Sequence, residues 1–305
     1  MARISYPLDG VLLFDKPLGL SSNTALQKVR RLFQAAKAGH TGTLDPLATG
    51  LLPICFGEAT KFSGALLDSN KTYRALIRLG QTTSTADAEG EILTQCQVAV
   101  DEPQINEVLA KFVGEISQLP PMHSAIKHQG KPLYEYIRKG ETVERAVRTI
   151  TIYELLLERF AGTELEITVR CSKGTYIRTL AEDIGHALGC GAHLLALRRL
   201  AIGPFSLDDA CSWDRLEAMS LAERESCLLP LDCMLQDLPI LELDAVQVTR
   251  IAQGQRLVLE HLQPGGRVRI YGGNSFIGVG LLDGKLLAAE RLLSNVAKNA
   301  ASSAE

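Results

Sequence analysis

The sequence lacks the patterns that mark secreted, membrane-spanning or disulfide-rich proteins. Near the start its apolar run at residues 11–14 is too short for a signal peptide, and no run approaches the ~20 apolar residues of a membrane helix. The 7 cysteines are an odd number and contain no Cys-x-x-Cys pair, which argues against a disulfide framework and a zinc site. We therefore expect a cytoplasmic protein whose cysteines are each small buried hydrophobes.

Motifs for bound nucleotides and for serine hydrolysis are also absent. The sequence has no Walker loop, no Gly-x-Gly-x-x-Gly after a strand and no Gly-x-Ser-x-Gly. Around the most unusual loop, residues 39–50, Asp45 has only His40 at a spacing that suits metal ligands, and octahedral oxygen sites usually need more carboxylates. We expect neither a cofactor nor a metal.

What the sequence does contain is typical of a globular protein of more than one domain. Its 305 residues are 46% hydrophobic and 22% charged, enough for a sizeable core. Alternating or helical apolar periods predict a main domain over residues 1–237 and a small β-rich domain over 238–305. The expected helices cover residues 21–37, with Thr24 and Gln27 as a capping box, 101–114 and 175–188; the expected strands cover 71–80, 148–156, 164–171, 267–271, 276–282 and 286–291.

The net charge of −3 hides a strong asymmetry. From Lys16 to Arg78 nine Lys or Arg stand against three acids, a balance of +6, whereas from Ser206 to Asp244 ten acids stand against two Arg, a balance of −8. The segment from Met122 to Arg148 has six Lys or Arg and no clear apolar period, which predicts an exposed basic insertion. Basic faces suit phosphate backbones, and the acidic stretch should face away from them.

Asp45 stands alone in Gly39-His-Thr-Gly-Thr-Leu-Asp-Pro-Leu-Ala-Thr-Gly50, a loop of small and hydroxyl residues. Such a loop exposes and aims a carboxylate, although a plain Asp-Pro turn explains it equally. The carboxylate could be a nucleophile, a base or, least well, a metal ligand. A glycosidase would need a second carboxylate; Asp87 is the nearest candidate, and otherwise caps its own loop.

A second set of candidates lies at Lys173-Gly-Thr-Tyr-Ile-Arg178, where a strand gives way to a helix. Arg178 could pair with a carboxylate, or lie on the surface like most arginines of a first helical turn. Tyr73 and Tyr176 could offer flat surfaces to a base, or be core residues with bonded hydroxyls. The residues alone leave these alternatives open.

Taken together, five motifs resemble the TruB-type tRNA pseudouridine synthases over about residues 10–235. They are Lys16-Pro17-x-Gly-x-Ser-Ser22, the loop at 39–50, Lys71-Thr-Tyr73, Lys173 to Arg178 and Leu197-Arg-Arg199. The C-terminal strands and glycines resemble a PUA-like RNA-binding domain. The resemblance implies an α+β pseudouridine synthase fold, with a central, mainly antiparallel sheet flanked by helices, followed by that β-rich domain.

The activity that the resemblance implies is conversion of uridine 55 in the tRNA T loop to pseudouridine. The base leaves through its N1 bond, rotates and rebonds through C5, so no cofactor is needed. Asp45 corresponds to the family's catalytic aspartate and Arg178 to the arginine that keeps it ionised, with Asp87 completing the network. Which atom Asp45 attacks first is left open.

The resemblance also implies roles in substrate binding. Tyr73 stacks on the flipped base, Tyr176 makes a second contact, Leu197 forms an apolar wall, and His40 fills the place that the base vacates. Lys16 and Pro17 support the active-site loop. The basic insertion, with Lys127 and Lys131 as RNA contacts, resembles a mobile segment that closes over the T loop.

Two other functions remain open at this point. One is a tRNA-binding folding chaperone that uses the same surface without chemistry. The other is the related enzyme that modifies ribosomal RNA under guide-RNA direction; the absence of long basic extensions at the ends of this sequence favours the stand-alone tRNA enzyme. A monomer is expected.

Overall fold

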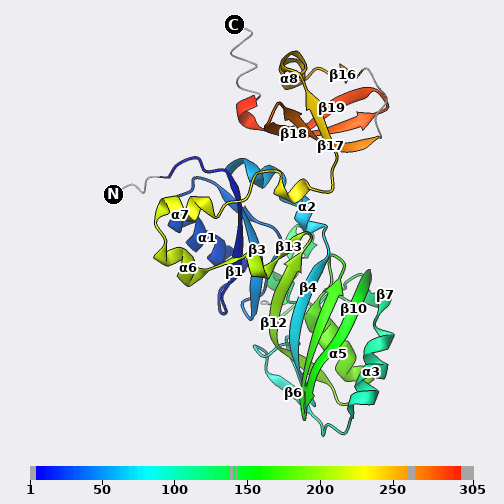
Figure 1. Cartoon of the computed structure of the whole chain (residues 1–305). Helices are drawn as coiled ribbons and strands as arrows, with labels where there is room; N and C mark the ends of the chain where they lie inside the picture. The colour runs from blue at the N-terminus through cyan, green and yellow to red at the C-terminus, as the bar shows by residue number, and fades with distance from the viewer. Residues whose placement is uncertain (1–4, 125, 138–139, 142, 260–264, 297–305) are drawn as a thin grey trace.

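The computed structural model describes residues 5–124, 126–137, 140–141, 143–259 and 265–296. It is an α+β protein with a large sheet, helices against it and a smaller β-rich region at the C-terminal end (Figure 1). In the described chain the large sheet has ten strands in the order β14-β1-β3-β12-β4-β11-β10-β7, with β2 beside β3 and β13 beside β12. Neighbours are antiparallel except at β1–β14 and β3–β12, as the expected fold class requires.

The strands of the large sheet are β1 (Gly10–Lys16), β2 (Ala38–His40), β3 (Ala48–Phe56), β4 (Lys71–Leu79), β7 (Gly114–Gln118), β10 (Arg148–Ala161), β11 (Glu164–Cys171), β12 (Ala192–Ile202), β13 (Phe205–Ser206) and β14 (Cys211–Ser212). Among the described residues, two hairpins form separate two-stranded sheets, β5–β6 (Gln81–Thr83, Ile92–Gln95) and β8–β9 (Lys127–His128, Lys131–Pro132). The smaller sheet contains β15 (Ile240–Leu243), β16 (Leu257–Val258), β17 (Gly266–Gly272), β18 (Ser275–Asp283) and β19 (Leu286–Leu292).

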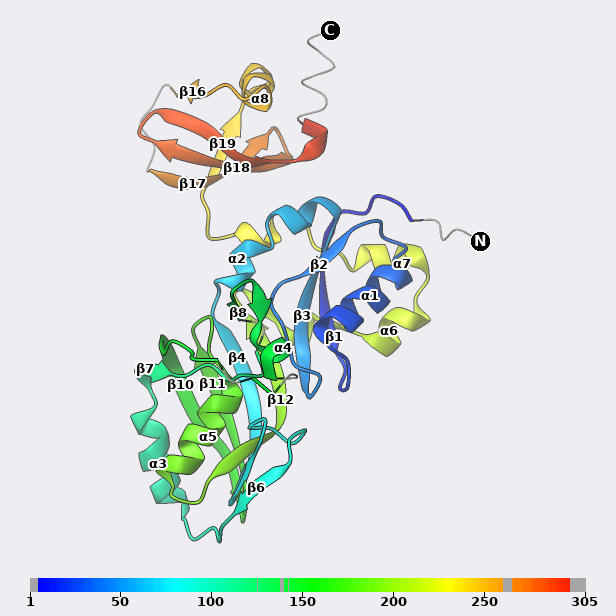
Figure 2. The ribbon, with the colours of Figure 1, turned by 180° about the vertical axis from the view of Figure 1, so that it is seen from behind.

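The α-helices are α1 (Ser22–Leu32), α2 (Gly64–Leu67), α3 (Glu102–Lys111), α4 (Leu133–Ile137), α5 (Ile177–Ala187), α6 (Trp213–Ala218), α7 (Leu221–Ser226) and α8 (Ala245–Ala252). The part of the chain that the structure describes also has three 3₁₀ turns, η1 (Gly57–Lys61), η2 (Leu207–Asp209) and η3 (Cys233–Leu235). Figure 2 shows α1, α3 and α5 against one face of the large sheet, and their apolar side chains join its main core. No described helix has the length and hydropathy to cross a membrane.

Strands β1 and β3 are buried on both faces, which explains their unbroken apolar sequence. Successive side chains of a strand point to opposite faces. Leu12 and Phe14 enter the main core, while Val11 and Leu13 enter a second core with Phe62 and the C-terminal region. Strands with both faces covered lose the polar alternation that marks a one-sided strand.

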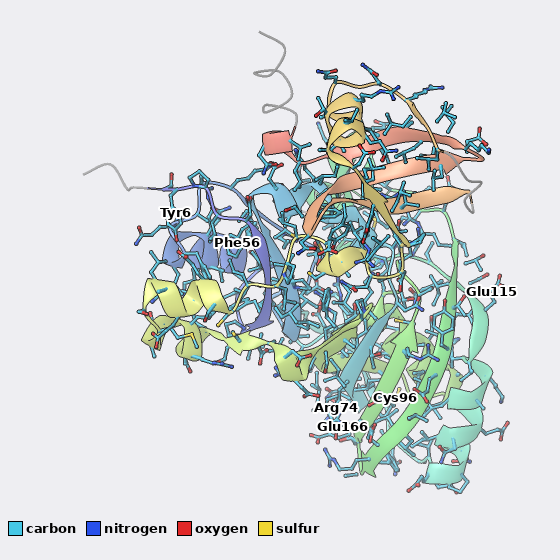
Figure 3. All side chains as sticks on the ribbon, turned by 45° about the horizontal axis from the view of Figure 1, so that its top comes forward. Tyr6, Phe56, Arg74, Cys96, Glu115 and Glu166 are labelled. Carbon is cyan, nitrogen blue, oxygen red and sulfur yellow. The ribbon has the colours of Figure 1, made fainter. Side chains whose placement is uncertain are left out.

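At the other end of the sheet only one face is covered. The outer face of β4, β10 and β11 carries charged side chains, including Arg74 and Glu166 (Figure 3), whose nearest charged atoms lie 3.9 Å apart. Arg159 also approaches Glu166, at 3.6 Å. These exposed pairs add little stability because water screens them, but they keep the open face polar.

The first helix is shorter than expected and is capped differently. It ends at Leu32, not Lys37, because Gln34 adopts φ of 52°, a left-handed conformation that ends a helix. The chain then turns so that its backbone bonds Tyr6. The expected capping box at Thr24 and Gln27 is wrong: Ser21 is the N-cap and accepts from the Thr24 backbone N–H.

Two further expectations need correction. The basic insertion is only partly exposed, because Met122, Ser124 and Leu133 are buried, and it contains the short elements β8, β9 and α4. These elements are only two or five residues long, which is too short to show an apolar period. Not every cysteine is a buried hydrophobe either: Cys96 is exposed and Cys227 is half-buried.

The C-terminal region packs directly on the large one. Phe276 of β18 makes an edge contact with Phe62, with ring centroids 5.4 Å apart, and Val279 belongs to the second core. Asp232, in the segment that leads into the smaller sheet, binds Arg269 of β17 at 2.9 Å. Apolar and ionic contacts therefore join the two regions.

Candidate active site

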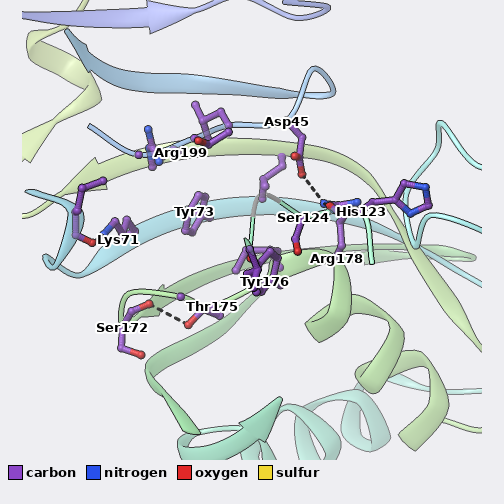
Figure 4. A pocket seen from close by; sticks show the side chains of 18 residues that line it. Asp45, Lys71, Tyr73, His123, Ser124, Ser172, Thr175, Tyr176, Arg178 and Arg199 are labelled. Atoms are coloured by element: carbon purple, nitrogen blue, oxygen red, sulfur yellow. Dashed lines mark hydrogen bonds and ion pairs between the residues drawn. The ribbon is translucent and has the colours of Figure 1, made fainter. Parts of the chain in front are cut away.

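A pocket of about 400 Å³ opens where the 39–50 loop meets β4, β12 and the start of α5 (Figure 4). His123, Ser124 and Ile126 close another side. Of the residues predicted as site residues, five line this pocket: Asp45, Tyr73, Tyr176, Arg178 and Leu197. Elements distant in sequence thus bring these side chains to one place.

Hydrogen bonds fix the Asp45 loop to α1 and to the turn before it. The Ser22 hydroxyl donates to the Leu44 carbonyl (2.9 Å) and accepts from the Leu44 N–H (2.7 Å). The Gly19 N–H donates to the Pro46 carbonyl, and the Ala48 N–H to that of Asp45 itself. A loop with its backbone satisfied on both sides of the carboxylate presents that carboxylate in one orientation.

Gly50 allows the end of the loop to pass close to β12. Its φ is +100°, and a Cβ built there would lie 2.4 Å from the Arg199 carbonyl oxygen, so no other residue fits without displacing the backbone. Gly50 also pairs with Lys16 of β1. The buried Lys16 ammonium donates to the Pro17 carbonyl (3.0 Å) and the Leu20 carbonyl (2.6 Å), and burial lowers its pKa to about 8.

Arg178 links the two candidate carboxylates. Its Nη2 lies 3.1 Å from Asp45 Oδ2 and its Nη1 lies 3.4 Å from Asp87 Oδ2. Nη2 also donates to the His123 carbonyl at 2.7 Å. Arg178 is only 6% exposed, so the alternative of a surface arginine is excluded.

Asp87 is held more firmly than Asp45. It is 2% exposed, and its Oδ1 accepts from the Thr85 hydroxyl (2.5 Å) and the Glu89 N–H (3.0 Å). The side chain of Asp45, by contrast, is 42% exposed and its partner is Arg178. Asp87 is built into the protein, whereas Asp45 faces open pocket space and can meet a ligand.

The pKa of Asp45 lies above that of an ordinary aspartate. Partial burial of the carboxylate by surrounding protein atoms is the largest cause, and the negative charge of Asp87 adds to it. The Arg178 guanidinium opposes this rise, followed by Lys16 and His123. The ionised form of Asp45 therefore depends on Arg178.

The start of α5 is set by Gln118, at the end of β7. Its side chain donates to the Tyr176 carbonyl (3.0 Å) and accepts from the Tyr176 N–H (2.8 Å). Tyr176 is the N-cap residue, and Arg178 follows in the first turn. Gln118 is buried, so a residue outside the predicted site positions two residues within it.

Tyr73 and Leu197 form the apolar part of the pocket. Tyr73 pairs with Arg199 across β4 and β12, and Leu197 lies two residues before Arg199 on the same face of β12. Burial raises the pKa of Tyr73. A flat ring beside an aliphatic wall suits one face of a planar base.

The remaining predicted residues lie elsewhere. His40 belongs to β2, is half-buried and does not line the pocket; burial lowers its pKa, and its Nδ1 has no hydrogen-bond partner among the described residues. Lys131 is exposed on β9. Lys127 lies in β8, and its side chain falls outside the described part of the structure.

Among the pocket-lining residues to which sequence reasoning gave no role of their own are three with ionisable side chains: Lys71, His123 and Arg199. The Lys71 ammonium donates to the carbonyls of Leu66, Leu67 and Ser69, which is a structural use. For Arg199, the period of two in Leu197-Arg-Arg199 would have placed it beside Leu197. In the described part of the chain no three His, Cys, Asp or Glu side chains are grouped to bind a metal.

Comparison with known families defines the class of protein. Residues 30–177 match the TruB family pseudouridylate synthase (N-terminal domain), residues 178–236 the tRNA pseudouridylate synthase B C-terminal domain, and residues 239–293 the pseudouridine synthase II TruB C-terminal domain. All three matching families are pseudouridine synthase domains, so the class of this protein is pseudouridine synthase.

Relatives and a solved structure agree with that class. The chain is 55% identical to a tRNA pseudouridine synthase B of Burkholderia mallei over 94% of its own length and 97% of the relative's. A Methylobacillus flagellatus protein of the same description is 55% identical over 91% and 92%. The crystal structure of a Cbf5-Nop10-Gar1 complex is similar in fold, with a TM-score of 0.70, 26% identity, and coverage of 93% of this chain and 84% of that chain.

The chain belongs to the TruB family of pseudouridine synthases. The resemblance drawn from its motifs is therefore confirmed, as is the expected fold class.

Proposed function

We propose that the protein converts uridine 55 in the T loop of tRNA to pseudouridine. The observation that carries this is the pocket in which Asp45, ion-paired with Arg178, faces Tyr73 and Leu197. The relatives that are 55% identical are named tRNA pseudouridine synthase B, which supports tRNA as the substrate. The pocket supplies a carboxylate and a surface for a flipped base.

Asp45 acts as the nucleophile in this proposal. A carboxylate splits a difficult transfer into two easier steps by a covalent intermediate, and only its ionised form attacks. Arg178 keeps Asp45 ionised against the effect of burial, and Asp87 holds Arg178 in place. The three residues form one unit with one exposed member.

The uridine must leave its stack to reach Asp45, which costs a few kcal/mol. Tyr73 stacks on the extruded base, Leu197 supports it, and Tyr176 makes a second contact. His40 fills the vacancy in the RNA from outside the pocket. Lys16 and Pro17 support the 39–50 loop, because the Lys16 ammonium binds the carbonyls of Pro17 and Leu20 in the turn that precedes α1.

RNA contact extends beyond the pocket. We assign residues 1–237 to a catalytic domain and 238–305 to a PUA-like RNA-binding domain; the family matches that end at residue 236 and begin at 239 support this division. Lys127 and Lys131, in the basic insertion at 122–148, are the proposed contacts to the T arm. The protein acts as a cytoplasmic monomer in this proposal.

The test is pseudouridine formation in a T-arm stem-loop by the wild-type protein and by Asp45→Asn. The amide keeps the shape of the carboxylate but cannot attack, so we expect loss of product by at least about 10³-fold with RNA affinity retained. Normal yield from Asp45→Asn would exclude Asp45 as nucleophile. If the wild-type protein binds the stem-loop but forms no pseudouridine, the chaperone function would be favoured.

The choice of RNA needs a second measurement. Pseudouridine mapped in total RNA from cells with and without the protein should differ at position 55 of tRNA. A difference confined to ribosomal RNA would contradict the proposal and favour the rRNA-directed function.

A further inference from the structure

Arg199 is a second arginine in the wall of the pocket, and its side chain interacts with the Leu51 carbonyl and the Tyr73 hydroxyl. It is 1% exposed, and its Nε donates to the Leu51 carbonyl at 2.7 Å. Its buried Nη2 has no hydrogen-bond partner among the described residues, and none of the ion pairs in that part of the chain includes Arg199. The protein thus buries a charged group and leaves part of it unsatisfied.

This arrangement is costly unless a ligand completes it. A guanidinium has five N–H donors and stays charged at every physiological pH. Burying a charge without a counter-charge is unfavourable, and each unsatisfied buried donor adds to that cost. An acceptor that arrives with the substrate would offset these costs only when the pocket is occupied.

The position of Arg199 identifies that acceptor. Arg199 pairs directly with Tyr73 across β12 and β4, and residues paired in this way have side chains within contact distance. A Cβ built on Gly42 would lie 3.7 Å from Arg199 Nη1, and Gly42, Tyr73 and Arg199 all line the pocket. Figure 4 shows Arg199 on one side of Tyr73 and Asp45 on the other. A base stacked on Tyr73 with its sugar toward Asp45 thus turns its far edge to Arg199.

We propose that Arg199 donates a hydrogen bond to a ring carbonyl oxygen of the flipped uracil and stabilises the negative charge that the detached base carries. Uracil has two such oxygens, O2 and O4. This inference rests on the proposed function, because it takes uridine in the pocket and Asp45 as its attacker. It assigns Arg199 to substrate contact and to charge stabilisation, the kind of interaction that contributes most to catalysis in dry sites.

The charge follows from the bonds that change. When the N1–C1′ bond breaks, its electron pair stays on uracil and spreads to O2 and O4, while C1′ gains a bond to Asp45 or C2′ loses a proton. After the base rotates, C5 donates a pair to C1′, Asp45 is released or C2′ regains its proton, the proton on C5 departs, and N1 takes up a proton. Between the two bonds to carbon the base is an anion beside Arg199.

The test combines enzyme variants with altered substrates. T-arm stem-loops carry uridine, 2-thiouridine or 4-thiouridine at the target position, because sulfur is a weak hydrogen-bond acceptor. Single-turnover rates at saturating enzyme and RNA dissociation constants are measured for the wild type, Arg199→Met, Arg199→Lys and Arg198→Met. Arg198 is the matched control: it is the next residue of β12, it binds Asp15 at 2.7 Å and it does not line the pocket.

We expect Arg199→Met to slow the uridine reaction roughly 100-fold while RNA affinity changes less than about threefold. One thio substrate should react at least tenfold more slowly with the wild type and with Arg198→Met, and this sulfur effect should fall below about twofold with Arg199→Met. Arg199→Lys, which keeps the charge but not the planar donor fork, should show an intermediate sulfur effect.

Equal sulfur effects in the wild type and Arg199→Met would overturn the proposal, as would the absence of any sulfur effect in the wild type. Melting temperatures verify that the variants fold; if Arg199→Met does not, Arg199→Lys decides by the same comparison, and a sulfur effect identical to that of the wild type contradicts the proposal. Failure of the proposed function is separate, since the wild type would then form no product even from uridine.

Discussion

Two buried arginines line one pocket, and they differ in what they bind. Arg178 touches two carboxylates and a backbone carbonyl, whereas Arg199 donates from Nε to the Leu51 carbonyl and leaves Nη2 unpaired among the described residues. Their exposure is similar, 6% and 1%. Burial therefore does not distinguish an arginine that pairs with carboxylates of the protein from one that is proposed to bind the substrate. The hydrogen-bond and ion-pair partners distinguish them.

The pairing of Arg178 has an energetic reason. Its two carboxylates would repel each other without it, and the charge of Asp87 makes it harder to ionise Asp45. Asp87 raises the pKa of Asp45 while Arg178 lowers it. Separate substitutions of Arg178 and Asp87 test how far the role of Arg178 depends on its charge and on the charges of its partners.

The largest effect is expected from Arg178→Met. This variant removes the cation between two carboxylates, and breaking a buried pair typically costs about 3–5 kcal/mol. We expect roughly a 10³-fold lower single-turnover rate and a lower melting temperature. Arg178→Lys, which restores charge, should recover part of both. Activity of Arg178→Met within threefold of the wild type would show that Asp45 needs no cation.

A smaller loss, about 10- to 100-fold in rate, is expected from Asp87→Asn. The amide oxygen still accepts from Thr85 and Glu89 N–H, but the charge that holds Arg178 is lost. The measurement is the single-turnover rate, with Glu89→Gln as the control for a carboxylate outside the Arg178 ion pairs. If both variants react equally, the ion pair of Asp87 contributes nothing specific.

The pH dependence should shift in opposite directions in two variants. Activity needs ionised Asp45, so it is present above the pKa of Asp45 and lost as the pH falls through it. Arg178 lowers the pKa of Asp45, so its removal should move the acid limb of the rate profile to higher pH. Asp87 raises the pKa of Asp45, so Asp87→Asn should move the acid limb to lower pH. Shifts of the same sign would contradict the proposed network.

The smallest effect, about tenfold or less, is expected from Gln118→Ala. Gln118 makes two hydrogen bonds to the Tyr176 backbone, each worth about 1 kcal/mol, and α5 retains its contacts with the core. The rate constant should fall while the sulfur effect at Arg199 remains. A lost sulfur effect would mean that the two sides of the pocket are not independent.

The part of the site that could be predicted is the part carried by unusual local sequence. The 39–50 loop and the Lys173–Arg178 motif could be recognised because each is a contiguous run of residues that resembles a family motif, although the residues alone left a plain turn and a surface arginine open. The hydrogen bonds of Ser22 to Leu44 and of Gln118 to Tyr176 could not be predicted, since they join segments 22 and 58 residues apart. Such contacts depend on packing, which no local period records.

Helix ends and covered faces were harder to predict for a related reason. The end of α1 depends on Gln34, whose left-handed backbone has no sequence signal as strong as glycine. Residues 11–14 show no alternation because both faces of β1 are covered, one of them by residues more than 200 positions away. Propensity describes a residue and its neighbours, whereas these outcomes were set by distant parts of the chain.

The second core has a consequence for how the molecule unfolds. Val11, Leu51 and Cys55, from the strands that hold the Asp45 loop, share it with Val279 and Leu293. Loss of the C-terminal region would leave an apolar face of the central strands open to water. The division near residue 238 therefore separates two sheets but not two independently unfolding units. Calorimetry should record one melting transition for the whole chain.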